Sequence, residues 1–192
     1  MKNKITSLSA LAVTVLVFLS LTGCMSTETT VSNTLPYEAQ QRINTSEEFD
    51  VDLTFKGHPD AETITASFAG AESSYSINRP FRGKLEQLFR AKFGEISDGS
   101  ENKVIVEIND IVPQSETGPP IHRLSMSVDV TVRHEGEENS RSFSFRTTVR
   151  PEDEGTEYTI AYRIPPQPIE DFLMQYIVGI DSFLDSTLGV EG

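Results

Sequence analysis

The order of apolar and polar residues divides the chain into three parts. Residues 5–21 are almost entirely apolar or small. Residues 26–47 are rich in Ser, Thr, Asn, Gln and Glu and contain few apolar side chains. From residue 48 onward, apolar residues recur with the periods of strands and helices. We therefore predict a processed segment at 1–23, a flexible tether at 24–47 and a single folded domain at 48–192.

Alternating apolar and polar residues predict the strands of this domain. The clearest alternation covers residues 124–133, where every second side chain is Leu, Met or Val. The same pattern predicts strands at 49–56, 64–68, 75–77, 104–112, 143–149 and 158–164. We expect the first two strands to form a hairpin. The three strands from 124 to 164 should form an antiparallel meander with turns at 135–139 and 152–155.

Two stretches have the spacing of one-faced helices. Asn78 and Pro80 suit a helix start, Gly94 suits its end, and the apolar residues between them fall on one stripe. A second stripe covers 169–188, after a proline-rich corner. One-faced strands and one-faced helices must cover each other. The predicted fold is therefore α+β, a single antiparallel sheet of about five or six strands with both helices on its apolar face.

The beginning of the chain has the features of an export signal. Lys2 and Lys4 form a short basic start, an apolar run follows, and the stretch ends at Leu21-Thr22-Gly23-Cys24. The run is also about as short as a membrane span can be, so length alone leaves an uncleaved helix open. Cys24 is the single cysteine, which excludes an internal disulfide framework.

Leu21-Thr22-Gly23-Cys24 resembles the lipobox of bacterial lipoproteins. The resemblance implies that the chain is cut before Cys24 and that this residue carries acyl chains. Two or more acyl chains hold a protein stably at a membrane. Met25 follows in place of the Asp that retains such proteins at the inner membrane. The implied location is therefore the periplasmic face of the outer membrane, with the outer face of a single cell membrane as the alternative.

The charge of the chain limits its partners. It contains 16 basic and 29 acidic residues, a net charge of −13. Phosphate backbones and anionic lipid surfaces repel such a protein, and no basic patch interleaved with aromatic residues is visible. We expect no nucleic-acid binding, and we expect the lipid to provide the membrane attachment.

No motif predicts catalysis, a metal or a cofactor. The sequence lacks the short signatures of serine hydrolases, zinc proteases and nucleotide-binding loops. His58 lies in a turn sequence, and His134 lies beside Glu135 at a strand end. Glu152-Asp153-Glu154-Gly155 places its carboxylates consecutively and not at the spacing of a calcium loop. We expect no enzymatic activity.

Met174 and Val178 interrupt the polar face of the second predicted helix, near Asp171, Asp181 and Asp185. They could contact the tether or a loop of the same chain. Alternatively, they could contact an envelope protein partner, and we take them as candidate partner-contact residues.

The lipobox, the polar segment and the two helices resemble small envelope lipoproteins of the YajG type and the auxiliary lipoproteins of envelope lipid transporters. The resemblance implies an accessory or assembly role with an envelope protein partner and supplies no catalytic residue. Two alternatives are kept. A periplasmic hydrolase would need a pocket holding His58, His122 or His134 beside carboxylates. A carrier of a small ligand or lipid would need an apolar cavity between sheet and helices.

Overall fold

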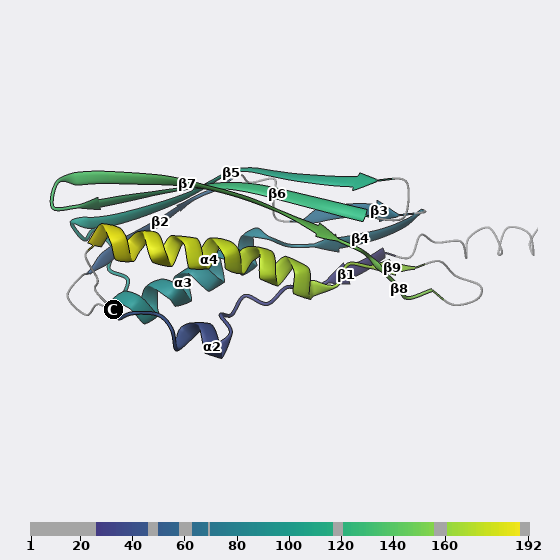
Figure 1. Cartoon of the computed structure of the whole chain (residues 1–192), viewed down its shortest axis with the longest axis horizontal. Helices are drawn as coiled ribbons and strands as arrows, with labels where there is room; N and C mark the ends of the chain where they lie inside the picture. The colour runs from purple at the N-terminus through teal and green to yellow at the C-terminus, as the bar shows by residue number, and fades with distance from the viewer. Residues whose placement is uncertain are drawn as a thin grey trace, which may run out of the picture.

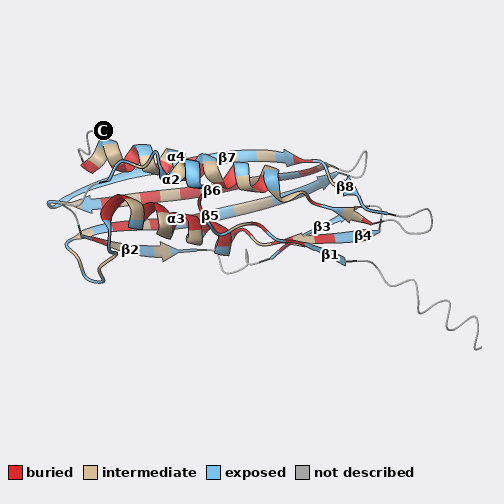
Figure 2. Cartoon of the chain, turned by 90° about the horizontal axis from the view of Figure 1, so that it is seen from below, coloured by how far each residue is buried: buried red, intermediate tan, exposed pale blue. Residues whose placement is uncertain are grey.

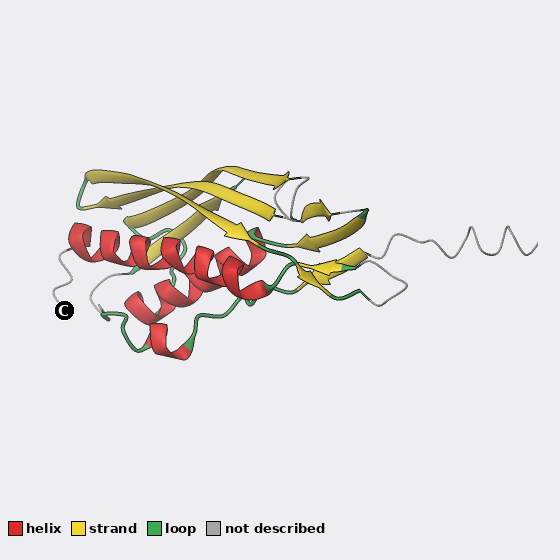
Figure 3. Ribbon diagram, turned by 45° about the vertical axis from the view of Figure 1, so that its right-hand side comes forward, coloured by secondary structure: helices red, strands yellow, loops and turns green. Residues whose placement is uncertain are grey.

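The computed structural model describes residues 26–45, 50–57, 63–68, 70–116, 121–155 and 161–188. The strands form one layer and the two long helices lie together against one side of it (Figure 1). Figure 3 shows the same division into a strand layer and a helix layer from another side. The α+β class and the placement of both helices on one face are confirmed.

The main sheet has four strands in the order β2-β5-β6-β7. They are β2 (Val51–Lys56), β5 (Asn102–Glu116), β6 (Ile121–His134) and β7 (Glu137–Val149). β5, β6 and β7 pair antiparallel, whereas β2 pairs parallel to β5. Glu135 and Gly136 make the β6–β7 turn, both with positive φ, which matches the twist of a tight hairpin.

Five further strands form two smaller sheets. A three-stranded sheet has the order β1-β4-β3, and a two-stranded one pairs β8 with β9. The strands are β1 (Ser26–Thr29), β3 (Ile64–Phe68), β4 (Ala71–Tyr75), β8 (Glu152–Asp153) and β9 (Tyr162–Arg163). β1 runs parallel to β4, and β3 runs antiparallel to it.

The prediction of a single antiparallel sheet is therefore wrong. β2 pairs with β5 and not with β3, so the expected first hairpin does not form. β9 pairs with β8 and does not extend the β6–β7 hairpin, so the third strand of the expected meander is also misplaced. Alternation fixes which face of a strand is buried but not which strand lies beside it. The chain between β2 and β5 contains α3, and such a long crossover allows parallel pairing.

The helices follow the predicted stripes. α3 covers Asn78–Phe93 and α4 covers Pro166–Leu188, while the short α2 (Tyr37–Gln40) lies outside α3, away from the sheet (Figure 1). Gly94 ends α3 with φ 77°, a conformation that costs glycine little. The part of the chain that the structure describes contains no helix long and apolar enough to span a membrane.

The core lies between the helices and the buried face of the main sheet, and Figure 2 shows buried residues on β6, α3 and α4. Tyr176 of α4 ties this helix to two strands: its hydroxyl donates to the Met126 carbonyl at 2.5 Å and accepts from the Phe145 N–H at 2.9 Å. A Cβ at Gly179 would lie 2.9 Å from the Phe143 ring. The absence of a side chain there lets α4 approach β7 closely.

The flexible tether is the second correction, for residues 26–45 that the structure describes. β1 belongs to a sheet, and two of the few apolar side chains of this stretch, Val31 and Leu35, are buried in the core. Lys84 of α3 donates to the Thr34 carbonyl at 2.7 Å, and the Leu35 N–H donates to a side-chain oxygen of Gln87 at 2.8 Å. Polar composition predicted mobility, but these few apolar anchors and the side chains of α3 hold the segment in place.

Candidate functional site

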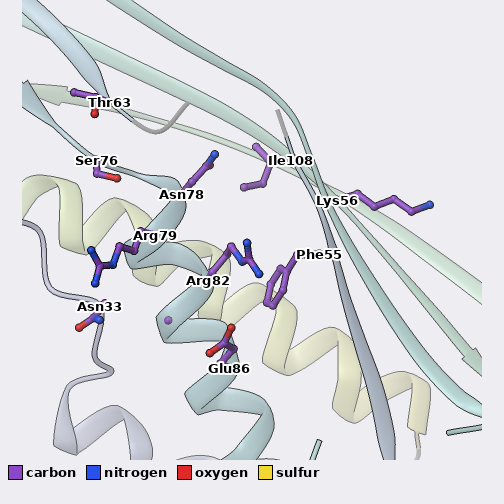
Figure 4. Close-up of a pocket in the computed structure, with 12 residues that line it drawn as sticks. Asn33, Phe55, Lys56, Thr63, Ser76, Asn78, Arg79, Arg82, Glu86 and Ile108 are labelled. Carbon is purple, nitrogen blue, oxygen red and sulfur yellow. The ribbon is translucent and has the colours of Figure 1, made fainter. Parts of the chain in front are cut away.

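A cavity of about 820 Å³ opens where three elements meet. Its walls come from the end of β2, the residue preceding β3 and the first turns of α3, with Asn33 of the N-terminal segment (Figure 4). β2 pairs only with Asn102–Glu107 of the longer β5, so the edge of β5 beyond that point is not covered by β2. Ile108, the next residue of β5, lines the cavity, and the β5–β6 register shifts between Ile108 and Asp110. Bulges of this kind often lie beside functional sites.

The charge of the cavity is opposite to that of the chain. Among the described residues, Lys56, Arg79 and Arg82 line it, together with one acid, Glu86. None of these three cations forms an ion pair within the described residues. In a chain with 29 acidic and 16 basic residues, the cavity is a local region of positive charge.

The three cations are spread along the site. Figure 4 shows Arg82 reaching toward Phe55, Arg79 on another side of α3 and Lys56 at the far rim with its amino group directed outward. The guanidinium carbon of Arg82 lies 4.8 Å from the centre of the Phe55 ring, a cation–π contact that restricts its position. An elongated ligand could contact Arg82 in the middle and one of the other cations at either end.

The remaining lining is mostly polar and uncharged. It consists of Asn33, Gly57, Thr63, Ser76, Asn78 and Gly83, with Phe55 and Ile108 as the apolar members. Gly83 has a structural role as well, because a Cβ there would lie 2.6 Å from the Asn33 carbonyl oxygen. The cavity offers hydrogen-bond donors and positive charge, and a small apolar surface. It is not the apolar cavity that a carrier of lipid chains would need.

The histidines lie away from the cavity wherever the structure describes them. His122 is buried at the start of β6, where its Nε2 hydrogen bonds to the Tyr75 hydroxyl and its Nδ1 lies 3.3 Å from the Ser115 hydroxyl. We call Tyr75, Ser115 and His122 the sheet cluster, because they join β4 to β5 and β6. Burial lowers the pKa of His122 below 6.5 and raises that of Tyr75. The ring is therefore neutral at pH 7.

The histidine pocket that a hydrolase would need is not formed by these residues. The hydrogen-bond partners of His122 are a phenol and a hydroxyl, and Phe68 packs edge-on against it. The Nδ1–H of His134 donates to the side-chain oxygen of Asn102 at 2.8 Å, and a carboxylate oxygen of Glu135 is 4.0 Å from its Nε2 at the hairpin end. His58 lies outside the described residues. No group of three or more metal-ligating side chains occurs in the described ranges.

A second buried polar group joins the two long helices. The Lys92 side chain of α3 is fully buried and pairs with Asp181 at 2.8 Å and with Asp185 at 2.5 Å, both on α4. We call these three residues the helix cluster. Lys84, also buried on α3, has its pKa lowered by burial, partly offset by Glu170. Both lysines bind the N-terminal segment as well, since Lys92 reaches the Asn44 carbonyl at 3.3 Å.

The predicted site residues are not brought together. Cys24 lies outside the described residues. Met174 is half-buried and packs against the core, whereas Val178 is 64% exposed. Asp181 and Asp185, expected on a solvated face, are held by Lys92 instead. The role of Met174 and Val178 in binding a partner stays a prediction.

Sequence reasoning missed the cavity altogether. Its cations come from β2 and α3, and their proximity depends on the parallel β2–β5 pairing. One local signal was present. α3 has two arginines and no acid in its first turns, the reverse of the usual preference at the positive end of a helix dipole.

Comparison with solved structures finds distant similarities of fold. An uncharacterized protein aligns with a TM-score of 0.45 and 8% identity over 85% of this chain and 99% of that chain. A minor lipoprotein from Acinetobacter baumannii aligns with a TM-score of 0.37 and 11% identity over 72% of this chain and 93% of that chain. No protein-family model and no curated protein matches the sequence. Similarity this distant carries no functional information.

Proposed function

We propose that this chain is a lipid-anchored protein of the cell envelope, attached through Cys24 and acting as a non-enzymatic accessory component. One observation carries the proposal beyond the lipobox. β1 begins at Ser26, two residues after Cys24, and it pairs with β4 over its whole length. The proposed lipid would therefore be joined directly to the folded domain.

This short connection constrains the orientation of the domain. Two residues span at most about 7 Å. Thr27 and Thr29 of β1 donate to the carbonyls of Tyr162 and Ile164, at 2.8 and 2.6 Å. The end of the molecule that holds β1, β8 and β9 would thus lie at the membrane. The β6–β7 turn and the C-terminal end of α4, at the opposite end in Figure 1, would point away from it.

Cellular fractionation tests the anchor. We expect the wild-type protein to sediment with membranes and to be released by detergent but not by high salt, because acyl chains and not charges hold it. Cys24→Ser should leave it in the soluble fraction. Separation of inner and outer membranes should place the wild type in the outer membrane, as Met25 implies. Membrane association that survives Cys24→Ser would refute the anchor.

The surface opposite the helices supports an accessory role. The outward face of β6 carries Ser125, Ser127, Asp129 and Thr131, none of which is buried. In the described residues β7 pairs with β6 alone, so its other edge is available for hydrogen bonding to an extended segment. The described residues that line the cavity include no histidine or cysteine.

Site-specific photo-crosslinking in intact cells tests the accessory role. A photoreactive residue at Ser144, an exposed position of β7, should crosslink to an envelope protein. The same residue at Glu38, exposed on α2, is the matched control and should not. Recovery of the uncrosslinked monomer alone, from probes along the whole of β7, would contradict this role while leaving the anchor untouched.

Binding of a small ligand is a second candidate function, and the cavity at the start of α3 favours it. The volume of about 820 Å³ falls in the usual range of ligand sites, about 300–1,000 Å³.

A further inference from the structure

We propose that the cavity between β2 and α3 binds a phosphate-bearing ligand, with Arg82 as its central contact and Arg79 and Lys56 at its two ends. The proposal names the ligand class for the second candidate function. It does not depend on the lipid anchor, because all contributing side chains belong to described residues of the domain.

The charged side chains that line the cavity favour an anionic ligand. A concave site lined by charges of one sign concentrates the field and attracts ligands of opposite charge. Among the described residues, three cations and one carboxylate line this cavity, while the whole chain has a net charge of −13. The surrounding acidic surface would repel anions elsewhere, so the cavity is where an anion is best accommodated.

The fold gives Arg79 and Arg82 little stabilisation beyond the contact of Arg82 with the Phe55 ring. Arg79 and Arg82 lie in the first turns of α3, where the helix dipole disfavours positive charge. Neither forms an ion pair within the described ranges, and both are exposed. The helix cluster shows the contrast, because Lys92 sits at the favourable end of the same helix with two carboxylates. Departures from local preference of this kind are typical of functional sites.

The chemical groups that line the cavity suit a phosphate attached to a carbon skeleton. A guanidinium donates two parallel hydrogen bonds to phosphate oxygens, and stacking on Phe55 limits the positions of Arg82 before any ligand arrives. Ser76 and Asn78 add hydroxyl and amide groups near the start of the helix. Phe55 and Ile108 supply an apolar surface for the carbon portion of the ligand. The combination suits a phosphate attached to a sugar, a glycerol or a lipid.

Two sources could provide this phosphate, a soluble phosphorylated compound or a phospholipid headgroup. For the first, calorimetric titration uses the full chain in dodecyl maltoside, a detergent without phosphate, with glucose 1-phosphate and pyrophosphate as probes and glucose as the neutral control. For the second, the chain is placed in phosphatidylcholine nanodiscs that contain photoreactive phosphatidylglycerol. Crosslinked residues are then identified by mass spectrometry.

The double variant Arg79→Gln/Arg82→Gln should weaken binding by at least about tenfold, since each guanidinium supplies a charge-assisted contact. Arg90→Gln removes an exposed arginine of the same helix outside the cavity and should leave binding unchanged. Glu86→Gln removes a carboxylate that lines the cavity and should tighten binding. The double variant should melt close to the wild type, because the removal of positive charge from the start of α3 offsets the loss of the Arg82–Phe55 contact.

Each result decides the question. Binding of a phosphorylated soluble probe that the double variant loses supports the proposal with a soluble ligand. Crosslinking of phosphatidylglycerol to cavity residues, lost in the same variant, supports it with a lipid headgroup. Absence of both signals in the wild type, or signals that the double variant retains, would overturn the proposal. Neither outcome bears on the anchor, which Cys24→Ser tests separately.

Discussion

The helix cluster and the sheet cluster both bury polar side chains, but one buries charged groups and the other neutral groups. The helix cluster keeps its charges and pairs them: Lys92 is enclosed between Asp181 and Asp185, where α3 meets α4. The sheet cluster keeps its groups neutral: Tyr75, Ser115 and His122 exchange hydrogen bonds where the two larger sheets meet. A charge can be buried only with a partner, whereas neutral polar groups need only hydrogen bonds.

The two clusters differ in their surroundings, and they should therefore differ in which changes destabilise them. The helix cluster also touches solvent, since its two carboxylates are 22% and 25% exposed, and it fixes two helices and the end of the N-terminal segment at once. The sheet cluster is enclosed by aromatic rings, with Phe68 and Tyr75 both edge-on to His122. Substitution of a charged residue should therefore destabilise the helix cluster most. Lowering the pH should destabilise the sheet cluster.

The largest expected effect comes from breaking the helix cluster. Lys92→Ala leaves two carboxylates facing each other beside the core without their cation. We expect a loss of about 3 kcal/mol in the free energy of unfolding, the usual cost of removing one partner from a buried ion pair. Urea denaturation at pH 7 measures it. Lys103→Ala is the control, because its side chain is 45% exposed and lies 3.9 Å from Asp52, and its removal should cost less than about 1 kcal/mol. Equal losses for the two variants would contradict the assigned role of Lys92.

The second-largest expected effect comes from removing one neutral hydrogen-bonding group from the sheet cluster. Tyr75→Phe keeps the ring but leaves Nε2 of the buried His122 without its phenol partner. A buried polar group left unpaired in this way costs about 1–3 kcal/mol. Tyr37→Phe changes the same group on a residue that is 74% exposed and should have no measurable effect in the same urea experiment. A neutral result for Tyr75→Phe would mean that the hydroxyl contributes nothing to the cluster.

Acid should separate the two clusters directly. Burial holds the pKa of His122 below its ordinary value of 6.5, so the unfolded chain takes up the proton first. Stability from this group is present above pH 6.5 and falls as the pH decreases below it. Unfolding curves between pH 8 and pH 5 should show this decline, and His122→Phe should remove it, whereas His134→Gln should retain it. A pH dependence that His122→Phe leaves unaltered would assign it to other groups.

The smallest expected effect on stability comes from an exposed residue of α4 close to the helix cluster. Val178 lies one turn before Asp181 on α4 and is 64% exposed, so Val178→Ala should change the free energy of unfolding by less than about 0.5 kcal/mol. The double variant Met174→Ala/Val178→Ala tests the predicted partner contact, and pull-down from envelopes should recover less of the partner. Unchanged recovery would remove these residues from the interface.

Much of the fold could be predicted because local periodicity reports burial. The stripes on α3 and α4 and the alternation on β6 all face the core as expected. Prediction failed at β2 and β9, where the faces were right but the neighbouring strands were not. It also failed at residues 26–45, where two buried side chains, Val31 and Leu35, outweigh a polar composition.

The candidate functional residues also fall into two groups, those suggested by adjacent residues in the sequence and those brought together only by the fold. Cys24 could be proposed as a lipidation site because the resemblance to a lipobox depends only on adjacent residues, and this assignment stays a prediction. The cavity could not be proposed in this way, since Lys56, Arg79 and Ile108 lie on separate elements that only the completed fold brings together.

The sequence by itself determined which side of α3, of α4 and of the strands of the main sheet faces inward, and where α3 begins and ends. These properties depend on neighbouring residues and on the period of the backbone. The tertiary structure alone decided which strands pair, which charges are buried and where cations meet in an acidic protein. Those outcomes depend on contacts between distant segments, and no local pattern records their free energies.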